Sequence, residues 1–421
     1  MNSHASKIAV AAPLAHDRPH ANDRIAVFEG VRGWLALSVL VYHSMLFASF
    51  RLDRVETSWL RAALAFFTLG DHFVSVFMIL SGFVVFLLLD EKRETYGVFI
   101  TRRWLRLWPM LAVTLLIGVV LSPLHGSALR QLSWADPWML HQADLTTVHE
   151  EQAWANVAAH LTMLHGLVPS SWWRDATGAF IGVGWSIATE WQFYLLAPAA
   201  FYLMRRAWGR YLMCALVAGC RIWTLNGGFA WMVNESQSFI GFKAHYFFLG
   251  AVSYFIYQAR NKPSGPLVFK PDWFVTCGLA ACLAVSELPS LAWVAVFSLV
   301  MFGAGNRESR LKPITALFTN SLSQYLGKIS YSIYLFHWTA IIIVIQCLAA
   351  AGKTSLEPLE AFAWICGGVL ALTLVGSHVL FHCVEQPCIR FGKKLFREKL
   401  AAGAEQQAAV RARPAPRRRA A

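Results

Sequence analysis

The chain has 421 residues, of which 57% are hydrophobic and only 14% are charged. A soluble domain is typically about 25% charged, so this composition argues against a soluble enzyme and favours a protein that crosses a membrane several times. The formal net charge is +13, but so apolar a chain is not typical of a solvated nucleic-acid binder, and we expect no nucleic-acid partner. The eight cysteines lie almost all in apolar runs without Cys-x-x-Cys spacing, which predicts core thiols, not disulfides or a metal site.

Ten apolar stretches approach the roughly 20 residues that a membrane-crossing helix needs. We therefore predict an all-α, polytopic integral membrane protein with about ten transmembrane helices. The stretches cover residues 33–50, 66–89, 104–121, 185–204, 211–225, 239–258, 273–288, 291–305, 324–350 and 361–383. Most lysines and arginines fall in the alternate segments that share a side with both chain ends, and this bias places both termini in the cytoplasm.

Three regions follow from this pattern. Residues 1–28 form a polar N-terminal tail, residues 29–390 form the transmembrane domain, and residues 391–421 form a basic C-terminal tail whose composition predicts disorder. Residues 122–184 form the long extracytoplasmic segment and are rich in tryptophan, histidine and acidic residues. An amphipathic run at 153–167 predicts an interfacial helix or a cap over the bundle.

The first span carries three ionisable residues on one helical stripe, Glu29, Arg32 and His43. The rise of about 1.5 Å per residue places His43 about 16 Å beyond Arg32, near the middle of the membrane, whereas Glu29 stays at the cytoplasmic rim. An imidazole there is a candidate general base because its pKa is near neutral. The alternative is a structural histidine bonded to a neighbouring helix. Glu29 is expected to pair with Arg32 or another arginine.

The third span begins with Arg103 and Arg106, which are i, i+3 neighbours on one face. At the level of Arg32 they would form an anion site, because guanidinium groups bind phosphate bidentately and stay charged. Plain anchoring by the positive-inside rule is the alternative.

The fourth span begins with Ser186 and Glu190, an i, i+4 pair. An unpaired carboxylate is costly in a membrane, so Glu190 is expected to position a hydroxyl substrate, to assist His43, or to neutralise an arginine. His337, at mid-span in the ninth stretch, is equally compatible with function and with packing. His378 and His382 have a metal-like i, i+4 spacing but no third ligand nearby, so a structural role is favoured.

In this order the segments resemble the acyltransferase 3 family of integral membrane acyltransferases. The matching motifs are Glu29-Gly-Val-Arg32-Gly with His43 eleven residues after the arginine, Phe77-Met-Ile-Leu-Ser81-Gly82-Phe83, Arg103-Trp-Leu-Arg106-Leu-Trp-Pro109, Trp185-Ser-Ile-Ala-Thr-Glu190, Ser330-Tyr331-Ser-Ile-Tyr334-Leu-Phe-His337-Trp338 and Val384-Glu385-Gln-Pro387. The resemblance implies transfer of an acyl group, commonly acetyl, from cytoplasmic acyl-CoA to a hydroxyl of a carbohydrate or of another envelope or secreted molecule. The resemblance also implies that His43 is the catalytic histidine. It implies that Arg103 and Arg106 are the family's arginine pair and that Glu190 is its carboxylate.

These observations predict a membrane-embedded O-acyltransferase of the bacterial inner membrane. We expect His43 and Glu190 to be catalytic, and the CoA phosphates to be bound by Arg32, Arg103 and Arg106. Substrate or structural support would come from Glu29, Ser186, Tyr331 and His337. Acyl-CoA, with acetyl-CoA foremost, would be a co-substrate, and no metal or permanently bound cofactor is expected. The expected partners are the lipid bilayer and a hydroxyl-bearing carbohydrate or envelope acceptor. The alternatives are a transporter of an anionic or acylated solute and an inert envelope scaffold.

Overall fold

The structure is a computed structural model that describes residues 18–229, 238–261, 270–304 and 309–396. Within these ranges it is all-α and contains no strand. The α-helices are α1 (Arg18–Phe47), α2 (Ser58–Phe67), α3 (Gly70–Lys92), α4 (Tyr96–Gln131), α5 (Pro137–Glu151), α6 (Ala153–Leu161), α7 (Gly184–Met204), α8 (Ala207–Leu225), α9 (Ile240–Asn261), α10 (Pro271–Ser286), α11 (Leu288–Ser298), α12 (Lys312–Thr319), α13 (Ser321–Ala350) and α14 (Pro358–Leu380). Two π-helical segments, η5 (Leu299–Gly303) and η6 (Phe381–Glu385), continue α11 and α14.

Five helices in the described ranges are long and apolar enough to cross a membrane: Arg24–Phe47, Gly70–Lys92, Tyr96–Gln131, Ser321–Ala350 and Pro358–Phe396. The consecutive segments Pro271–Ser286 and Leu288–Gly303 pass the same criterion only together, and they are bent by 116° at their junction. Each of the ten predicted stretches lies mostly in helix within the described residues, although 66–89 crosses the break between α2 and α3. The all-α, multi-pass architecture is therefore confirmed. The number of about ten crossings and the cytoplasmic orientation of the termini stay predictions.

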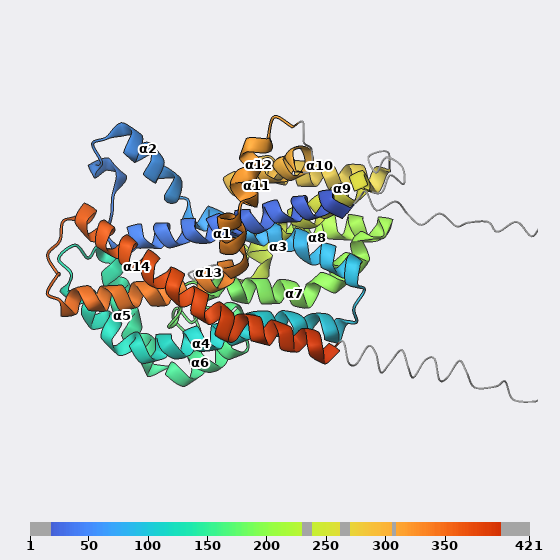
Figure 1. The fold of residues 1–421 in the computed structure, drawn as a ribbon. Helices are drawn as coiled ribbons and strands as arrows, with labels where there is room; N and C mark the ends of the chain where they lie inside the picture. The colour runs from blue at the N-terminus through green and yellow to red at the C-terminus, as the bar shows by residue number, and fades with distance from the viewer. Residues whose placement is uncertain (1–17, 230–237, 262–269, 305–308, 397–421) are drawn as a thin grey trace, which may run out of the picture.

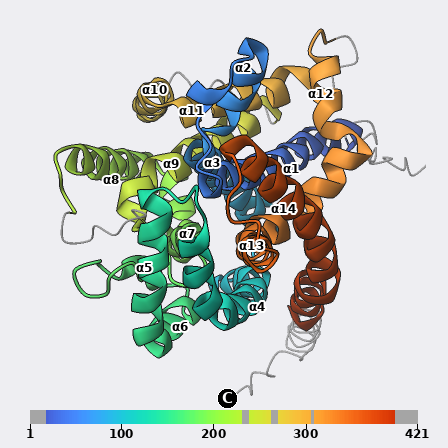
Figure 2. The same cartoon turned by 90° about the vertical axis from the view of Figure 1, so that its left-hand side faces the viewer.

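Most of the long helices run roughly along one axis (Figure 1), and α1 begins at the same end of the bundle at which α14 and its continuation end. Helix α13 packs against α1, α4 and α14 (Figure 2). The contact between α1 and α13 is close because glycines lie in it. A Cβ on Gly327 would lie 2.0 Å from the backbone oxygen of Glu29, and one on Gly33 would lie 2.7 Å from the backbone of Gly327. These small residues bring the candidate residues of α1 against α13.

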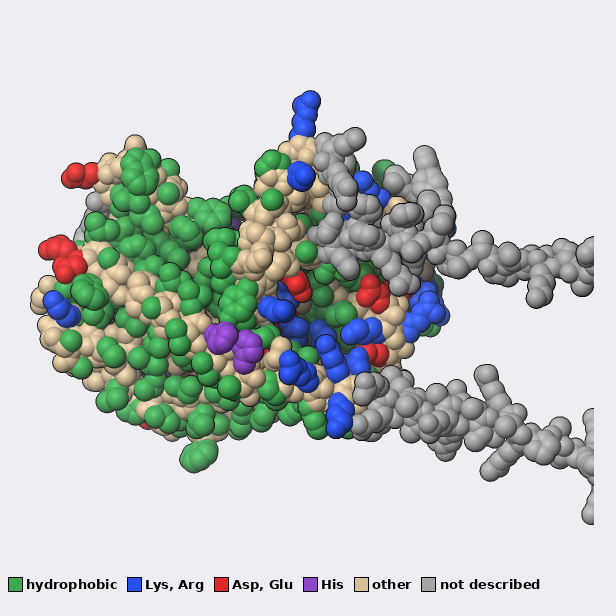
Figure 3. Space-filling model, in the orientation of Figure 1, with side chains coloured by type: hydrophobic (Ala, Val, Ile, Leu, Met, Phe, Trp, Pro, Cys, Tyr) green, Lys and Arg blue, Asp and Glu red, His purple; other side chains and the backbone are tan. Residues whose placement is uncertain are grey.

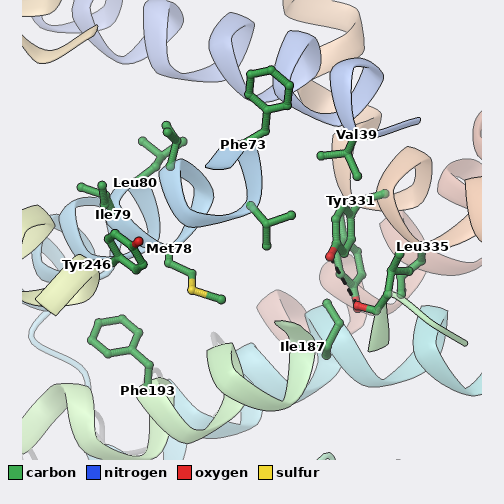
Figure 4. Close-up of a cluster of buried hydrophobic side chains, with 14 of the residues drawn as sticks. Val39, Phe73, Met78, Ile79, Leu80, Ile187, Phe193, Tyr246, Tyr331 and Leu335 are labelled. Carbon is green, nitrogen blue, oxygen red and sulfur yellow. Dashed lines mark hydrogen bonds between the residues drawn. The ribbon is translucent and has the colours of Figure 1, made fainter. Parts of the chain in front are cut away.

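The second close pair is α3 with α9, where Gly82 approaches the carbonyl of Phe247 and Gly250 approaches that of Ile79. Helix α7 completes this part of the core, and Phe193 stacks on Phe247 with ring centroids 4.2 Å apart. Figure 4 shows the packing, with Met78 pointing from α3 towards α7. This core keeps α3 and α7 at fixed positions on two sides of the cavity described below.

The segment predicted as an extracytoplasmic loop is largely helical. Helix α4 extends to Gln131, so the first ten residues of the predicted segment 122–184 belong to a span. Helices α5 and α6 then fold back, and both lie beside α4 (Figure 2). The tails also differ in extent, because α1 begins at Arg18 and the last helix continues to Phe396. Residues 1–17 and 397–421 lie outside the described residues.

Candidate active site

A cavity of about 310 Å³ lies between α1, α3, α4, α7, α9, α13 and the helical continuation of α14. Its wall follows α3 from Lys92 to Val74, a length of about 27 Å at the α-helical rise per residue. The cavity is therefore long and narrow. One end, which we call the basic end, is bordered by Lys92, Arg102 and Lys393. Figure 3 shows lysine and arginine side chains gathered at this end of the bundle.

The structure places Arg32, Arg103 and Arg106 on the wall of this one cavity. Arg103 lies over the rings of Tyr194 and Phe99, with its guanidinium carbon 5.7 and 5.9 Å from their centroids. Arg106 interacts electrostatically with both other arginines. None of the three forms an ion pair with a residue in the described part of the chain. Three half-buried cations facing a common space are suited to bind a polyanion.

Two carboxylates lie near the arginines. Glu190 on α7 lines the cavity and accepts hydrogen bonds from Ser81 (2.9 Å) and from Tyr194. Glu385 is buried and accepts a hydrogen bond of 2.7 Å from Ser332. Both carboxylates interact electrostatically with Arg32 and Arg106. Of the three roles considered for Glu190, the geometry favours partial neutralisation of the arginines.

The far end of the cavity is formed by hydroxyl groups. Ser186 and Tyr334 line it, and their oxygens lie 2.7 Å apart. Tyr331 also lines the cavity and donates a 2.7 Å hydrogen bond to the carbonyl of Leu107, which joins α13 to α4. The hydroxyls of Ser186 and Tyr331 thus link neighbouring walls of the cavity. Their role as supporting residues stays a prediction.

His43 and His337 form a direct pair between α1 and α13. Nε2 of His337 lies 3.1 Å from Nδ1 of His43. Nδ1 of His337 lies 3.3 Å from the carbonyl of Ile333, and Nδ1 of His43 also lies 3.1 Å from the carbonyl of Val39. A carbonyl can only accept, so each Nδ1 is assigned a proton, and Nε2 of His337 then accepts from His43. This arrangement leaves Nε2 of His43 with its lone pair available to take a proton.

The pair lies beyond the hydroxyl end of the cavity and does not line it. The ring of His337 is fully buried, with its centroid 5.9 Å from that of Tyr334, whereas His43 is half-buried. Trp338 packs edge-on against His43, with centroids 5.4 Å apart. Glu190 makes no hydrogen bond to His43, so within the described chain it does not assist the histidine directly.

Glu29 is placed differently from the other predicted site residues. Its backbone lies against Gly327, and its side chain is exposed and does not line the cavity. Within the described residues it forms no ion pair, so the expected pairing with an arginine is not present there. The close packing of α1 on α13 explains this difference, because it turns the Glu29 side chain outwards.

Some site residues were not identified by sequence reasoning. Tyr194 lies four residues after Glu190, and this helical spacing is a signal that could have found it. Ser81 and Glu385 stood in recognisable motifs but were given no role. The π-helix Phe381–Glu385 is an irregular turn that ends at the site residue Glu385. Such turns occur often at functional sites, but no residue pattern predicts this one.

The comparisons with known proteins agree with this geometry. The family model for the acyltransferase domain matches residues 25–380, most of the chain. The chain therefore belongs to the acyltransferase 3 family, and its fold and family together define a multi-pass membrane protein of the acyltransferase class. It is also similar to "Acyltransferase MdmB" of Streptomyces mycarofaciens, with 29% identity over 185 residues that cover 44% of this chain and 41% of that relative. The similarity thus spans about two fifths of the relative's length. No solved structure matches the chain.

Proposed function

We propose that the protein transfers an acyl group, with acetyl foremost, from cytoplasmic acyl-CoA to a hydroxyl of a carbohydrate or another envelope acceptor. The observation that carries the proposal is the arrangement of one cavity. Three arginines face it near its basic end, and its other end lies beside a histidine pair with a free basic nitrogen. The family membership supports the same reaction class.

The donor would enter through the basic end. Arg32, Arg103 and Arg106 would bind the CoA diphosphate, since guanidinium groups form strong charge-assisted hydrogen bonds with phosphate oxygens. The extended pantetheine arm fits a long, narrow space and would carry the thioester towards Ser186 and Tyr334. Glu190 and Glu385 would limit the repulsion among the arginines when no donor is bound.

The chemistry would take place beyond the hydroxyl end. Nε2 of His43 would accept the proton of the acceptor hydroxyl as its oxygen attacks the thioester carbonyl. Collapse of the tetrahedral intermediate breaks the carbon–sulfur bond, and the proton held by His43 passes to the CoA thiolate. The products are an ester and free CoA. General-base assistance of this kind raises the reaction rate by a factor of about 10²–10⁴.

The acceptor would approach from the opposite end of the bundle, the side on which positive-inside bias places residues 122–184. Trp154 and Trp172 in this segment are 88% and 75% exposed, and exposed tryptophan rings can stack on sugar faces or lie at the membrane interface. The exposed rings support a carbohydrate acceptor. We also propose that the protein lies in the bacterial inner membrane with both termini in the cytoplasm, as the charge bias indicates.

The donor half of the proposal is tested by release of free CoA from acetyl-CoA. The purified protein, in nanodiscs, is incubated with a pooled envelope carbohydrate extract, and Arg103→Gln is compared with the wild type. We expect release that requires the extract, and a KM for acetyl-CoA raised at least tenfold in the variant, because one charge-assisted contact is lost.

Arg390→Gln is the matched control, because Arg390 is exposed on the same end of the molecule and does not line the cavity. Its KM should equal that of the wild type. Solute flux without consumption of acyl-CoA would contradict the proposal and would identify a transporter.

A further inference from the structure

Three basic side chains border the basic end of the cavity, outside the inner arginines. They come from three elements: Lys92 ends α3, Arg102 lies on α4, and Lys393 lies on the helical continuation of α14. Gly392 allows the helical continuation of α14 to approach α4, since a Cβ on Gly392 would lie 2.9 Å from the side chain of Leu105. Both Gly392 and Leu105 line the cavity. The terminal helix is therefore part of the cavity wall.

The three cations differ in how they are neutralised. Arg102 is paired with Glu94, and both side chains are largely buried. Lys92 and Lys393 are exposed and form no ion pair within the described residues. Lys92 interacts favourably with Glu94, the partner of Arg102, but it also lies near enough to Arg102, Arg103 and Lys393 to be repelled by them. Two like charges held at one opening are relieved by a bound anion.

The opening thus presents two levels of positive charge, with two lysines outside and three arginines inside. CoA carries two separate anionic groups on one ribose, a diphosphate at the 5′ position and a phosphate monoester at the 3′ position. A monoester bears up to two negative charges on a compact group, which suits the point charge of a lysine ammonium. The diphosphate continues into the pantetheine arm and must therefore lie on the inner side.

We infer that Lys92 and Lys393 form a subsite for the 3′-phosphate of CoA and make the protein select CoA over dephospho-CoA. This inference rests on the proposed function, because it requires an acyl-CoA donor in the cavity. A lipid phosphate at the membrane surface presents related chemistry, so the test must separate the two sources.

The test is equilibrium binding of acetyl-CoA and of acetyl-dephospho-CoA to the full-length protein in phosphatidylcholine nanodiscs at low ionic strength. The wild type should bind acetyl-CoA at least about tenfold more tightly, and the preference should shrink as salt is added because exposed charges are screened. In Lys92→Gln/Lys393→Gln the affinity for acetyl-CoA should fall to that for acetyl-dephospho-CoA, and the affinity for the latter should not change.

Lys394→Gln is the matched control. Lys394 is the exposed neighbour of Lys393 but does not line the cavity, so its variant should keep the wild-type preference. A monodisperse gel-filtration profile and an unchanged melting temperature show that the double variant is folded.

Two results would overturn the inference and leave the proposed function standing. The first is equal binding of both nucleotides by the wild type. The second is an effect of the double variant seen only in discs with added phosphatidylglycerol, and equal for both nucleotides, which would assign the lysines to a lipid headgroup. If neither nucleotide binds to the wild type, the proposed function and the inference fail together.

Discussion

Two of the contacting histidine pairs in the described part of the chain, His43–His337 and His160–His165, are alike in composition but differ in what their nitrogens bond to. In the pair His43–His337, the rings are joined edge to edge through nitrogens 3.1 Å apart. The second pair is His160–His165, in the segment 152–167 that contains α6 and that we call the cap. Its rings are stacked, with centroids 3.9 Å apart and an angle of 7° between their planes. Each ring of the second pair bonds to a backbone carbonyl, His160 to Asn156 at 2.9 Å and His165 to Gly184 at 3.0 Å.

Access separates the two pairs. Both rings of the cap pair are fully buried, so neither can exchange a proton with a substrate. His43 is half-buried and keeps one nitrogen free, whereas His337 is buried behind it. A histidine acts as a base only where a lone pair and a path to it coexist. The first pair is thus suited to chemistry and the second to holding the cap against the start of α7.

The largest expected effect is on the rate after His43→Ala. Loss of the proposed general base should lower acyl transfer by about 10²–10⁴. Binding of acetyl-CoA should stay unchanged, because His43 does not line the cavity proposed for the donor. CoA release and equilibrium binding measure the two quantities. His378→Ala, which changes an exposed histidine on α14, is the control and should retain full activity.

The second effect is on stability as a function of pH. Burial lowers the pKa of His160 to about 4 from the ordinary 6.5, and it also lowers the pKa of His165 well below its ordinary value. Between pH 4 and pH 6.5 the unfolded chain binds more protons than the folded one. The stability present above pH 6.5 is therefore lost as the pH falls towards 4. For His160 alone the shift corresponds to about 3 kcal/mol.

Melting temperatures measured between pH 8 and pH 4 would show this loss. The comparison variant is His160→Asn/His165→Gln, which keeps amide donors near both carbonyls but cannot titrate at these positions. His149, which is bonded to Asp175 and interacts electrostatically with His160, is unchanged in this variant. The melting temperature of the variant should depend less on pH. An equal dependence in both proteins would refute the assignment.

The third effect concerns the partner of the base. His337→Phe removes one of the two acceptors near Nδ1–H of His43 and leaves the carbonyl of Val39. The loss of about one hydrogen bond should lower kcat by about tenfold, with KM for acetyl-CoA unchanged. His337→Gln retains an acceptor oxygen and should restore most of the rate. If both variants were equally impaired, His337 would have only a packing role.

The smallest effect is expected when the cap pair, His160 and His165, is substituted and the catalytic rate is measured. At pH 8 the variant His160→Asn/His165→Gln should keep kcat within about twofold of the wild type. A loss comparable to that of His43→Ala would remove the distinction between the two pairs.

The span pattern and several candidate residues could be predicted because they depend on local sequence. Helical spacing identified Arg103 with Arg106 and placed His43 far along α1 from Arg32. The contact between His43 and His337 could not be predicted, because 294 positions separate them and only the packing of α1 on α13 brings them together. The outward turn of Glu29 follows from that same packing. The π-helix before Gln386 and the role of Lys393 in the cavity wall depend on how the last helix continues beyond its apolar stretch, a region that composition alone predicted to be a tail.

The central claim is that donor and acceptor reach His43 from opposite ends of the bundle. It is tested most directly in oriented proteoliposomes that contain a hydroxyl-bearing carbohydrate acceptor inside and receive isotope-labelled acetyl-CoA outside, with the basic end of the protein facing outwards. We predict that labelled ester accumulates inside the vesicles while labelled acetyl-CoA is consumed outside. With His43→Ala we expect neither change. Ester formed only when both substrates share one compartment, or undiminished transfer by His43→Ala, would contradict the account.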